Sequence, residues 1–126
     1  MKSFIISLAI AALLLCGSLF YMSRLERISD ELHEINAEIT EALRNEEYEL
    51  AKIKIPELER AISDYEIFCA ALENHEHLDT MESTIAELKI YTESQHQSDA
   101  LAKSNVLAFL FEHLPKNSRL RLENIL

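Results

Sequence analysis

The sequence predicts an all-α protein whose N-terminal transmembrane helix continues into an antiparallel four-helix bundle or a pair of stacked helical hairpins. The first observation is the scarcity of glycine. The single glycine, Gly17, lies in an apolar N-terminal segment, so the rest of the chain lacks the residue that β-hairpin turns most often need. The second is the recurrence of apolar residues in steps of three and four, which is the helical period. The third is an uncharged run over residues 4–22.

Residues 4–22 have the length and composition of a membrane-spanning helix. At about 1.5 Å per residue the run reaches roughly 28 Å, close to the thickness of the hydrocarbon core of a bilayer. A cleaved signal peptide has the same first half, and small residues after Cys16 offer a cleavage site. Because the apolar and helical pattern continues past that site, we expect an uncleaved signal anchor at residues 1-23. Lipidation of Cys16 is a further alternative, which the bulky Leu15 before it disfavours.

The charges on the two flanks of this run bear on its orientation. Lys2 and the amino terminus precede it, whereas Arg24 and Arg27 follow it, so the two sides nearly balance. A very short N-terminal tail with a lysine usually stays in the cytoplasm. We therefore expect a single-pass protein of the cell membrane whose helical domain, residues 24-126, is extracytoplasmic.

The first soluble helix is expected to be the anchor helix prolonged to about Arg44, because an apolar seam continues straight from the anchor. That seam contains Leu25, Ile28, Leu32, Ile35, Ile39 and Ala42. Beside it runs an acidic stripe, which we define as Glu31, Glu34, Glu38 and Glu41. No lysine or arginine lies between Arg27 and Arg44, and like charges at that spacing repel each other. The stripe is a solvated face, a surface for the net-positive C-terminal tail, or a surface for a basic partner protein.

The second helix is expected to begin after Asn45, which supplies an N-cap, and to end near Glu73. Glu46 and Glu47 would place negative charge on its first turn, where the helix dipole favours it. Pro56 removes one backbone donor, so we expect a kink there, or a short break and restart. The apolar seam of this helix contains Tyr48, Ala51, Ile55, Leu58, Ile62, Tyr65, Cys69 and Leu72.

Residues 74–78 are expected to form a polar connection that contains the best candidate for a metal site. His75 and His77 alternate there with carboxylates, and imidazole with carboxylate suits Zn²⁺ or a similar cation. The other histidines are too scattered to supply further ligands, so a solvated loop is the favoured interpretation and no cofactor is expected. Asp79, with Glu82 three residues later, forms a capping box that predicts the start of the third helix.

The third helix is expected to end in the polar run of residues 93–97, and the fourth to begin at Ser98 or Asp99. The fourth helix is apolar over most of its circumference, so it is either central in the bundle or covered by something else. Pro115 is expected to end it. The tail, residues 116–126, is too apolar to hang free and is expected to dock back on the bundle. Its basic residues are Lys116, Arg119 and Arg121.

The formal net charge of -10 lies in the soluble part of the chain. Such a surface repels the phosphates of nucleic acids and anionic lipid headgroups, so neither is expected as a partner. An internal disulfide is excluded, because Cys16 lies in the apolar run and Cys69 in the soluble part. Cys69 lies on an apolar seam and is expected to be a buried hydrophobe. Without a nucleophile on a sharp turn or a glycine-rich loop, the sequence does not predict an enzyme.

The order of motifs resembles one known family. Asn-Glu-Glu-Tyr at residues 45–48 and His-Glu-His-Leu-Asp at residues 75–79 follow the apolar segment. Phe-Glu-His-Leu-Pro at residues 111–115 then leads to Leu-Glu-Asn-Ile-Leu at residues 122–126, the most specific of these motifs. Together they are similar to the DUF4363 family, whose members look like small membrane-anchored or exported proteins of Gram-positive, often spore-forming, bacteria. The resemblance implies no activity and no catalytic residues, and Pro56 departs from the family pattern.

Two classes of function remain. In the first, a non-enzymatic, membrane-tethered helical module scaffolds or regulates another envelope protein, and the acidic stripe stands just above the membrane where that partner would bind. In the second, the extracytoplasmic domain binds a small molecule or a cation in the interior of its bundle. A one-pass anchor with no cytoplasmic domain cannot pass a signal inward alone, which favours the first class. A dimeric coiled coil along the first soluble helix is a further alternative.

Overall fold

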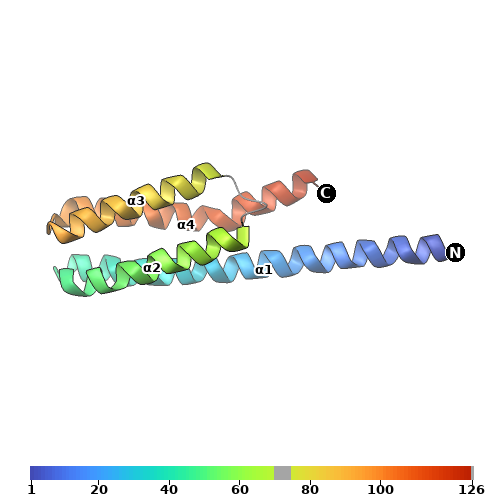
Figure 1. Cartoon of the computed structure of the whole chain (residues 1–126), viewed down its shortest axis with the longest axis horizontal. Helices are drawn as coiled ribbons and strands as arrows, with labels where there is room; N and C mark the ends of the chain where they lie inside the picture. Colours follow the sequence, from blue (N-terminus) through green and yellow to red (C-terminus); the bar gives the residue numbers. More distant parts are fainter. Residues whose placement is uncertain (70–74, 126) are drawn as a thin grey trace.

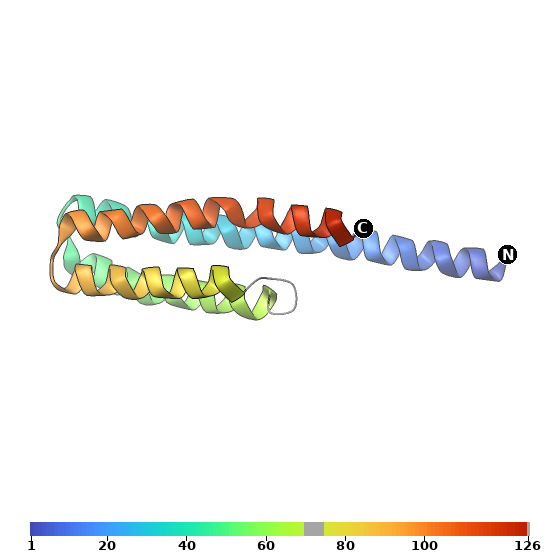
Figure 2. The same cartoon turned by 90° about the horizontal axis from the view of Figure 1, so that it is seen from above.

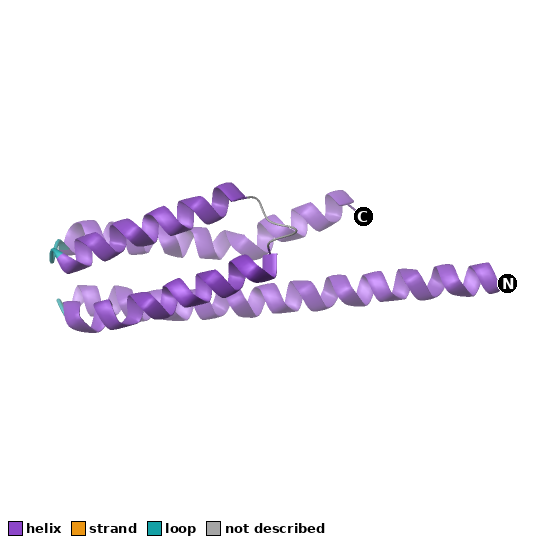
Figure 3. Ribbon diagram, viewed as in Figure 1, coloured by secondary structure: helices purple, strands orange, loops and turns teal. Residues whose placement is uncertain are grey.

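The computed structural model of the protein is almost entirely helical (Figures 1 and 3). The structure describes the backbone of residues 1–69 and 75–125 and the side chains of residues 1–68 and 77–114. Within these ranges it contains no strand, and the all-α prediction is confirmed. The helices are α1 (Lys2–Arg44), α2 (Tyr48–Cys69), α3 (His75–Glu93) and α4 (Gln97–Ile125).

The helices form an antiparallel bundle in which each packs against two neighbours. α1 contacts α2 and α4, and α3 contacts the same two helices (Figures 1 and 2). The turns that join α1 to α2 and α3 to α4 lie together at the end far from the N-terminus, whereas both termini lie toward the opposite end (Figure 3). This is the up-down-up-down arrangement that short connections favour.

One seam from each helix contributes to the core. On α1 the buried residues alternate in steps of four and three, which keeps them on one stripe of the helix. Among them are Ser29 and Asn36, two polar residues that the apolar pattern does not place in a core. The largest fully buried side chains are Tyr65, Phe111, Leu25, Leu32, Ile39, Leu43, Ile55, Leu58, Met81, Leu88, Leu107 and Leu114.

The two helical hairpins, α1–α2 and α3–α4, share one turn geometry. Glu46 and Gln95 have φ of 58° and 59°, the only positive values among the described residues. Around each of them the same three amides bond back to the end of the preceding helix. The bonds in the first turn are Asn45 to Glu41, Glu46 to Leu43 and Glu47 to Ala42; those in the second are Ser94 to Ile90, Gln95 to Thr92 and His96 to Tyr91.

Counting from these turns, the buried residues of one hairpin occupy the same positions as those of the other. Leu32 and Ile39 of α1 correspond to Met81 and Leu88 of α3. On the second helix of each hairpin, Leu58 corresponds to Leu107, Tyr65 to Leu114, Ala51 to Ala100 and Ile55 to Ser104. The fold is therefore a four-helix bundle made of two equivalent hairpins, so both architectures expected from the sequence describe it.

The N-terminal half of α1 lies outside the bundle. Among the described residues α1 alone is long and apolar enough to cross a membrane, and its most apolar window has a mean hydropathy of 2.4 and no buried residue. A membrane anchor and a signal sequence both have these properties. Packing against the bundle begins near Tyr21, whose ring stacks on that of Phe68 with the centroids 5.1 Å apart.

Two predicted helix starts are wrong. Asn45 is the C-cap of α1 rather than an N-cap, and the backbone turns at Glu46 before α2 starts at Tyr48. α3 begins at His75, so the expected polar connection is helical from that residue onward and the expected capping box lies inside the helix. Leu78 is buried in the core, and this favours an additional helical turn before Asp79. A capping motif reflects only local sequence and gives no information about this burial. The predicted end of the second helix lies outside the described residues.

Neither proline ends a helix. α2 runs through Pro56 without interruption, which excludes a break at that residue. α4 continues through Pro115 to Ile125, so the prediction that Pro115 ends it is wrong. A proline lacks the amide that would bond the carbonyl four residues earlier, here that of Phe111. The hydroxyl of Ser29 on α1 donates a hydrogen bond of 2.8 Å to this carbonyl and replaces the missing donor.

Candidate functional site

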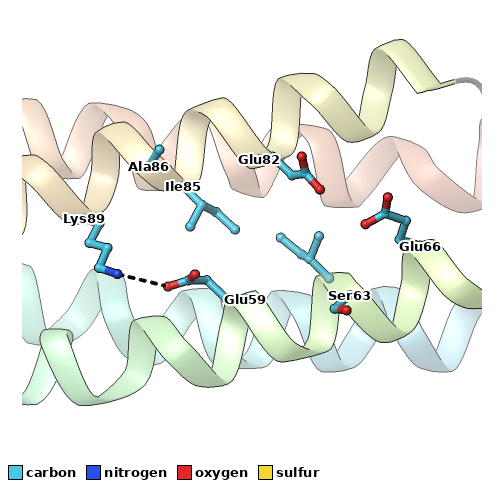
Figure 4. Close-up of a pocket in the computed structure, with 8 residues that line it drawn as sticks. Glu59, Ser63, Glu66, Glu82, Ile85, Ala86 and Lys89 are labelled. Atoms are coloured by element: carbon cyan, nitrogen blue, oxygen red, sulfur yellow. Dashed lines mark ion pairs between the residues drawn. The ribbon is translucent and has the colours of Figure 1, made fainter.

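A cleft of about 370 Å³ opens between α2 and α3 (Figure 4). It lies at the interface where neighbouring helices pack least closely. The buried Ile62 and Ile85 form its apolar floor. The other residues that line it are Glu59, Ser63, Glu66, Glu82, Ala86 and Lys89. Charged groups above an apolar floor make this cleft the candidate binding site.

Helical spacing places the charged residues along the two edges of the cleft. Glu59 and Glu66 are seven residues apart on α2, and Glu82 and Lys89 are seven apart on α3, so each pair lies on one face of its helix two turns apart. Figure 4 shows that the antiparallel helices bring Lys89 opposite Glu59 at one end and Glu82 opposite Glu66 at the other. One end thus joins unlike charges, and the other joins like charges.

The equivalence of the two hairpins explains why the cleft opens here. The interface that corresponds to α2–α3 is α1–α4, where the buried Asn36 donates a hydrogen bond of 2.9 Å from Nδ2 to the carbonyl oxygen of Ser104. The residues at the corresponding positions of α3 and α2 are Ile85 and Ile55. Isoleucine side chains cannot donate or accept a hydrogen bond, so this cross-link is missing from the corresponding position between α2 and α3.

The electrostatics of the cleft differ between its two ends. Lys89 Nζ lies 3.9 Å from Glu59 Oε1, and both side chains are about half exposed. At the other end the negative charge of Glu66 raises the pKa of Glu82, and partial burial, a hydrogen bond with Glu66 and the charge of Asp79 act in the same direction. Glu82 therefore takes up a proton more readily than an ordinary glutamate, and its charge is the one that a cation in the cleft would neutralise.

The chemistry available in the cleft is that of binding a positively charged group. Among the described residues no group of three histidine, cysteine, aspartate or glutamate side chains is arranged to hold a metal ion. Two facing carboxylates above an apolar floor suit a ligand that carries a positive charge on an apolar body, such as an organic amine. Sequence periodicity could not reveal this pair, because Glu66 and Glu82 belong to different helices.

The acidic stripe is exposed along its whole length but is partly neutralised from within the chain. Lys54 of α2 lies 2.8 Å from Glu38, and the hydrogen bond that Lys54 donates to Glu38 raises the pKa of Lys54. Glu41 lies 3.9 Å from Arg44. Among the described side chains, Glu31 and Glu34 have no basic partner. The part of the stripe nearest the apolar half of α1 is therefore the part that remains open.

His75 and His77, the predicted metal-site candidates, lie in the first turn of α3. Residues two apart on a helix do not face each other, so the extended-loop geometry that motivated the metal site is wrong. The side chain of His75, like that of Cys69, lies outside the described part. The candidate has thus lost its geometric basis.

We define the outer face of α4 by three residues, the apolar Val106 and Phe109 and the adjoining His113. Val106 and Phe109 are 41% and 60% exposed. The rings of Phe109 and His113 pack with their centroids 4.2 Å apart. α4 lies at a corner of the bundle, so the alternative in which it is the central helix is wrong.

The fold defines a class of helical-hairpin bundle with an apolar N-terminal extension of its first helix. The family model for a domain of unknown function, DUF4363, matches residues 19–125, which is most of the chain. The protein therefore belongs to the DUF4363 family, as its motifs predict. Neither a curated protein nor a solved structure matches it.

Proposed function

We propose that the protein is a non-enzymatic helical module, tethered to a bacterial membrane by the first half of α1, that scaffolds or regulates another envelope protein. The observation that carries this proposal is the continuity of α1, in which a single helix contains the apolar segment and one side of the bundle. A continuous helix holds the bundle at a fixed height and orientation above the bilayer. In this proposal the bundle, within residues 24-126, is extracytoplasmic.

Two surfaces on this bundle suit a protein partner. The first is the open part of the acidic stripe, Glu31 and Glu34, which would attract a basic segment. The second is the outer face of α4, where Val106 and Phe109 expose apolar area of the kind that protein interfaces cover. An envelope protein that places an apolar patch on α4 and basic side chains on α1 would use both.

Membrane fractionation and intact-mass measurement of the mature chain test the tether. We expect the full-length mass in the membrane fraction, resistant to extraction at high pH. A soluble chain that has lost the residues up to about the Cys16 region would contradict the anchor and show a cleaved signal peptide. Cross-linking in intact membranes should then recover a stoichiometric envelope protein.

Charge substitutions on the surface of the bundle test the partner. The double variant Val106→Glu with Phe109→Glu should lose the cross-linked envelope protein while keeping the helicity of the wild type. Ile90→Glu is the matched control, because Ile90 is an exposed apolar residue, 61% exposed, that belongs to α3 instead of α4. If the double variant and the control retain the partner equally, α4 is not its binding surface.

The cleft between α2 and α3 favours a second candidate function, an extracytoplasmic domain that binds a cation or a small basic molecule. Glu66 and Glu82 supply the negative charge for it, and Ile62 and Ile85 supply the apolar contact. A diamine or a divalent cation should then raise the melting temperature of the wild type and fail to do so in Glu66→Gln with Glu82→Gln. Equal shifts in both proteins would exclude the cleft as the binding site.

A further inference from the structure

Three buried or half-buried hydrogen bonds fix how far α4 extends along α1. Ser29 donates to the carbonyl of Phe111 at 2.8 Å, and Asn36 donates to that of Ser104 at 2.9 Å. Seven residues later on α1 and seven residues earlier on α4, Gln97 Nε2 donates to the carbonyl of Leu43 at 2.9 Å. One step of seven residues on α1 thus matches one step of seven on the antiparallel α4. The axial register of the two helices is therefore set at three separate points.

The same register places the last turns of α4 beside the apolar half of α1. The next step of seven residues puts Ser118 level with Met22, the last residue of the uncharged run. Lys116 is then level with Arg24, and Arg119 and Arg121 lie within roughly 5 Å of the level of Met22 along the axis, at 1.5 Å per residue. Figures 1 and 2 show the end of α4 extending past the end of α2 toward the N-terminal half of α1.

The core seam of α4 does not continue into these last turns. Its positions up to Leu114 hold residues that are buried in the bundle, such as Leu107 and Phe111. The next positions in the same three-four alternation are Ser118 and Arg121. An arginine at a core position is unsuited to packing along an apolar helix. The sequence of the last turns therefore fits a different environment from that of the bundle core.

The composition of this segment indicates what that environment is. Residues 116–125 contain three basic residues and one acidic residue in a chain whose net charge is -10. Between the basic residues lie Leu120 and Leu122, followed by Ile125. Basic residues interleaved with large apolar ones are typical of helices at a bilayer surface, where basic side chains reach the headgroups and apolar ones the acyl chains. The net charge of the whole chain conceals this local exception.

We propose that the end of α4, residues 116–125, binds the anionic headgroups of the membrane that α1 enters. The bundle would then contact the bilayer at two points, through the apolar half of α1 and through the end of α4, and its tilt would be fixed. This inference rests on the proposed tether, because the register locates residues 116–125 relative to α1, and only the tether locates α1 relative to the membrane. The partner is an anionic lipid surface, to which basic residues near a membrane are attracted.

Fluorescence from a single tryptophan tests the lipid contact, because the chain contains no tryptophan of its own. The full chain with Leu122→Trp is reconstituted in vesicles of phosphatidylcholine with or without phosphatidylglycerol. Each kind of vesicle is prepared once with lipids brominated near the headgroup and once with lipids brominated deep in the acyl chain. We expect emission at shorter wavelength and strong quenching in the vesicles that contain phosphatidylglycerol. Quenching should decline in neutral vesicles, at high salt, and when Arg119→Gln and Arg121→Gln are added.

Two further reporters separate the tether from the lipid contact. Leu13→Trp lies at the middle of the apolar run of α1 and should be quenched by the deep bromines in both kinds of vesicle. Phe109→Trp lies high on the exposed face of α4 and should be quenched in neither. If Leu13→Trp is quenched but Leu122→Trp is not, the tether stands and the lipid contact is wrong. If Leu13→Trp is not quenched, the tether itself fails.

Two other outcomes would also overturn the inference. If Leu122→Trp emits at short wavelength without quenching, the end of α4 is buried against protein instead of lipid. If it is quenched equally in neutral vesicles and in the Arg119→Gln, Arg121→Gln variant, the contact is apolar and does not select anionic headgroups.

Discussion

At the scale of single residues, the hydroxyl of Ser29 allows α4 to continue through Pro115. The bond of 2.8 Å from Ser29 to the carbonyl of Phe111 satisfies an acceptor that has lost its helical amide. We expect Ser29→Ala to lower the free energy of unfolding by about 1 to 3 kcal/mol, the usual cost of an unsatisfied buried polar group. Thermal and chemical denaturation would measure this change.

Pro115→Ala supplies the control, because alanine has the backbone amide that proline lacks and can donate it to the carbonyl of Phe111. In this background Ser29→Ala should cost clearly less than in the wild type, and the difference measures the coupling between the two residues. Equal costs in both backgrounds would show that the Ser29 hydroxyl does not compensate for the proline.

Glu82 is the residue whose protonation should affect stability most clearly. Its pKa is raised in the folded protein, chiefly by the charge of Glu66, so the charged form is disfavoured by folding. Stability is therefore lost as the pH rises through the folded-state pKa of Glu82 and is recovered as the pH falls. Glu82→Gln should raise the melting temperature at neutral pH, and this gain should vanish below the ordinary value of 4.5.

Glu87 on the same helix is the matched control for Glu82. It lies 2.7 Å from Lys103, so Glu87→Gln removes an attraction instead of a repulsion and should lower the melting temperature slightly at neutral pH. A fall in the melting temperature of both variants would mean that Glu66 and Glu82 do not repel each other in the folded protein.

At the scale of elements, the two turns hold glutamate and glutamine in a conformation that favours glycine. Glu46 and Gln95 have φ of 58° and 59°, and the left-handed region costs a residue with a Cβ atom about 1 kcal/mol. Glu46→Gly and Gln95→Gly should each raise the free energy of unfolding by a few tenths of a kcal/mol to about 1 kcal/mol, once the greater backbone entropy of glycine is deducted. Denaturant titration checks both.

The neighbouring Glu47 is the control for these turn variants, since its φ is not positive. Glu47→Gly removes no strain and adds backbone entropy to the unfolded chain, so it should lower stability. If all three glycine variants are destabilised alike, the two turns are not strained.

The helices are predicted well from the sequence, because helical periodicity involves residues only three or four positions apart. The three-four alternation identifies the seams, and the end of α1 near Arg44 is confirmed. What it misses depends on partners far along the chain: the donor from Ser29 that lets α4 pass Pro115, the Lys54 that pairs with Glu38, and the facing carboxylates in the cleft. Helical periodicity shows which face of one helix is buried, but it does not show which residues of different helices meet.

At the scale of the whole molecule, the two equivalent hairpins meet at unequal interfaces. The α1–α4 interface is cross-linked by three hydrogen bonds in steady register, one of which comes from Asn36 in the core. The α2–α3 interface contains the cleft and the repelling pair Glu66 and Glu82. The hairpins should therefore separate first along α2 and α3 while α1 and α4 remain paired.

Hydrogen exchange of the full chain in detergent micelles tests this order of opening. Backbone amides of α2 and α3 beside the cleft should exchange faster than those of α1 and α4 near Asn36 and Ser104, because low contact density permits local opening at lower free energy. Glu82→Gln should slow exchange in α2 and α3 and leave α1 and α4 unchanged. Uniform exchange across the four helices would show that the bundle opens as one cooperative unit and that the unequal interfaces have no dynamic consequence.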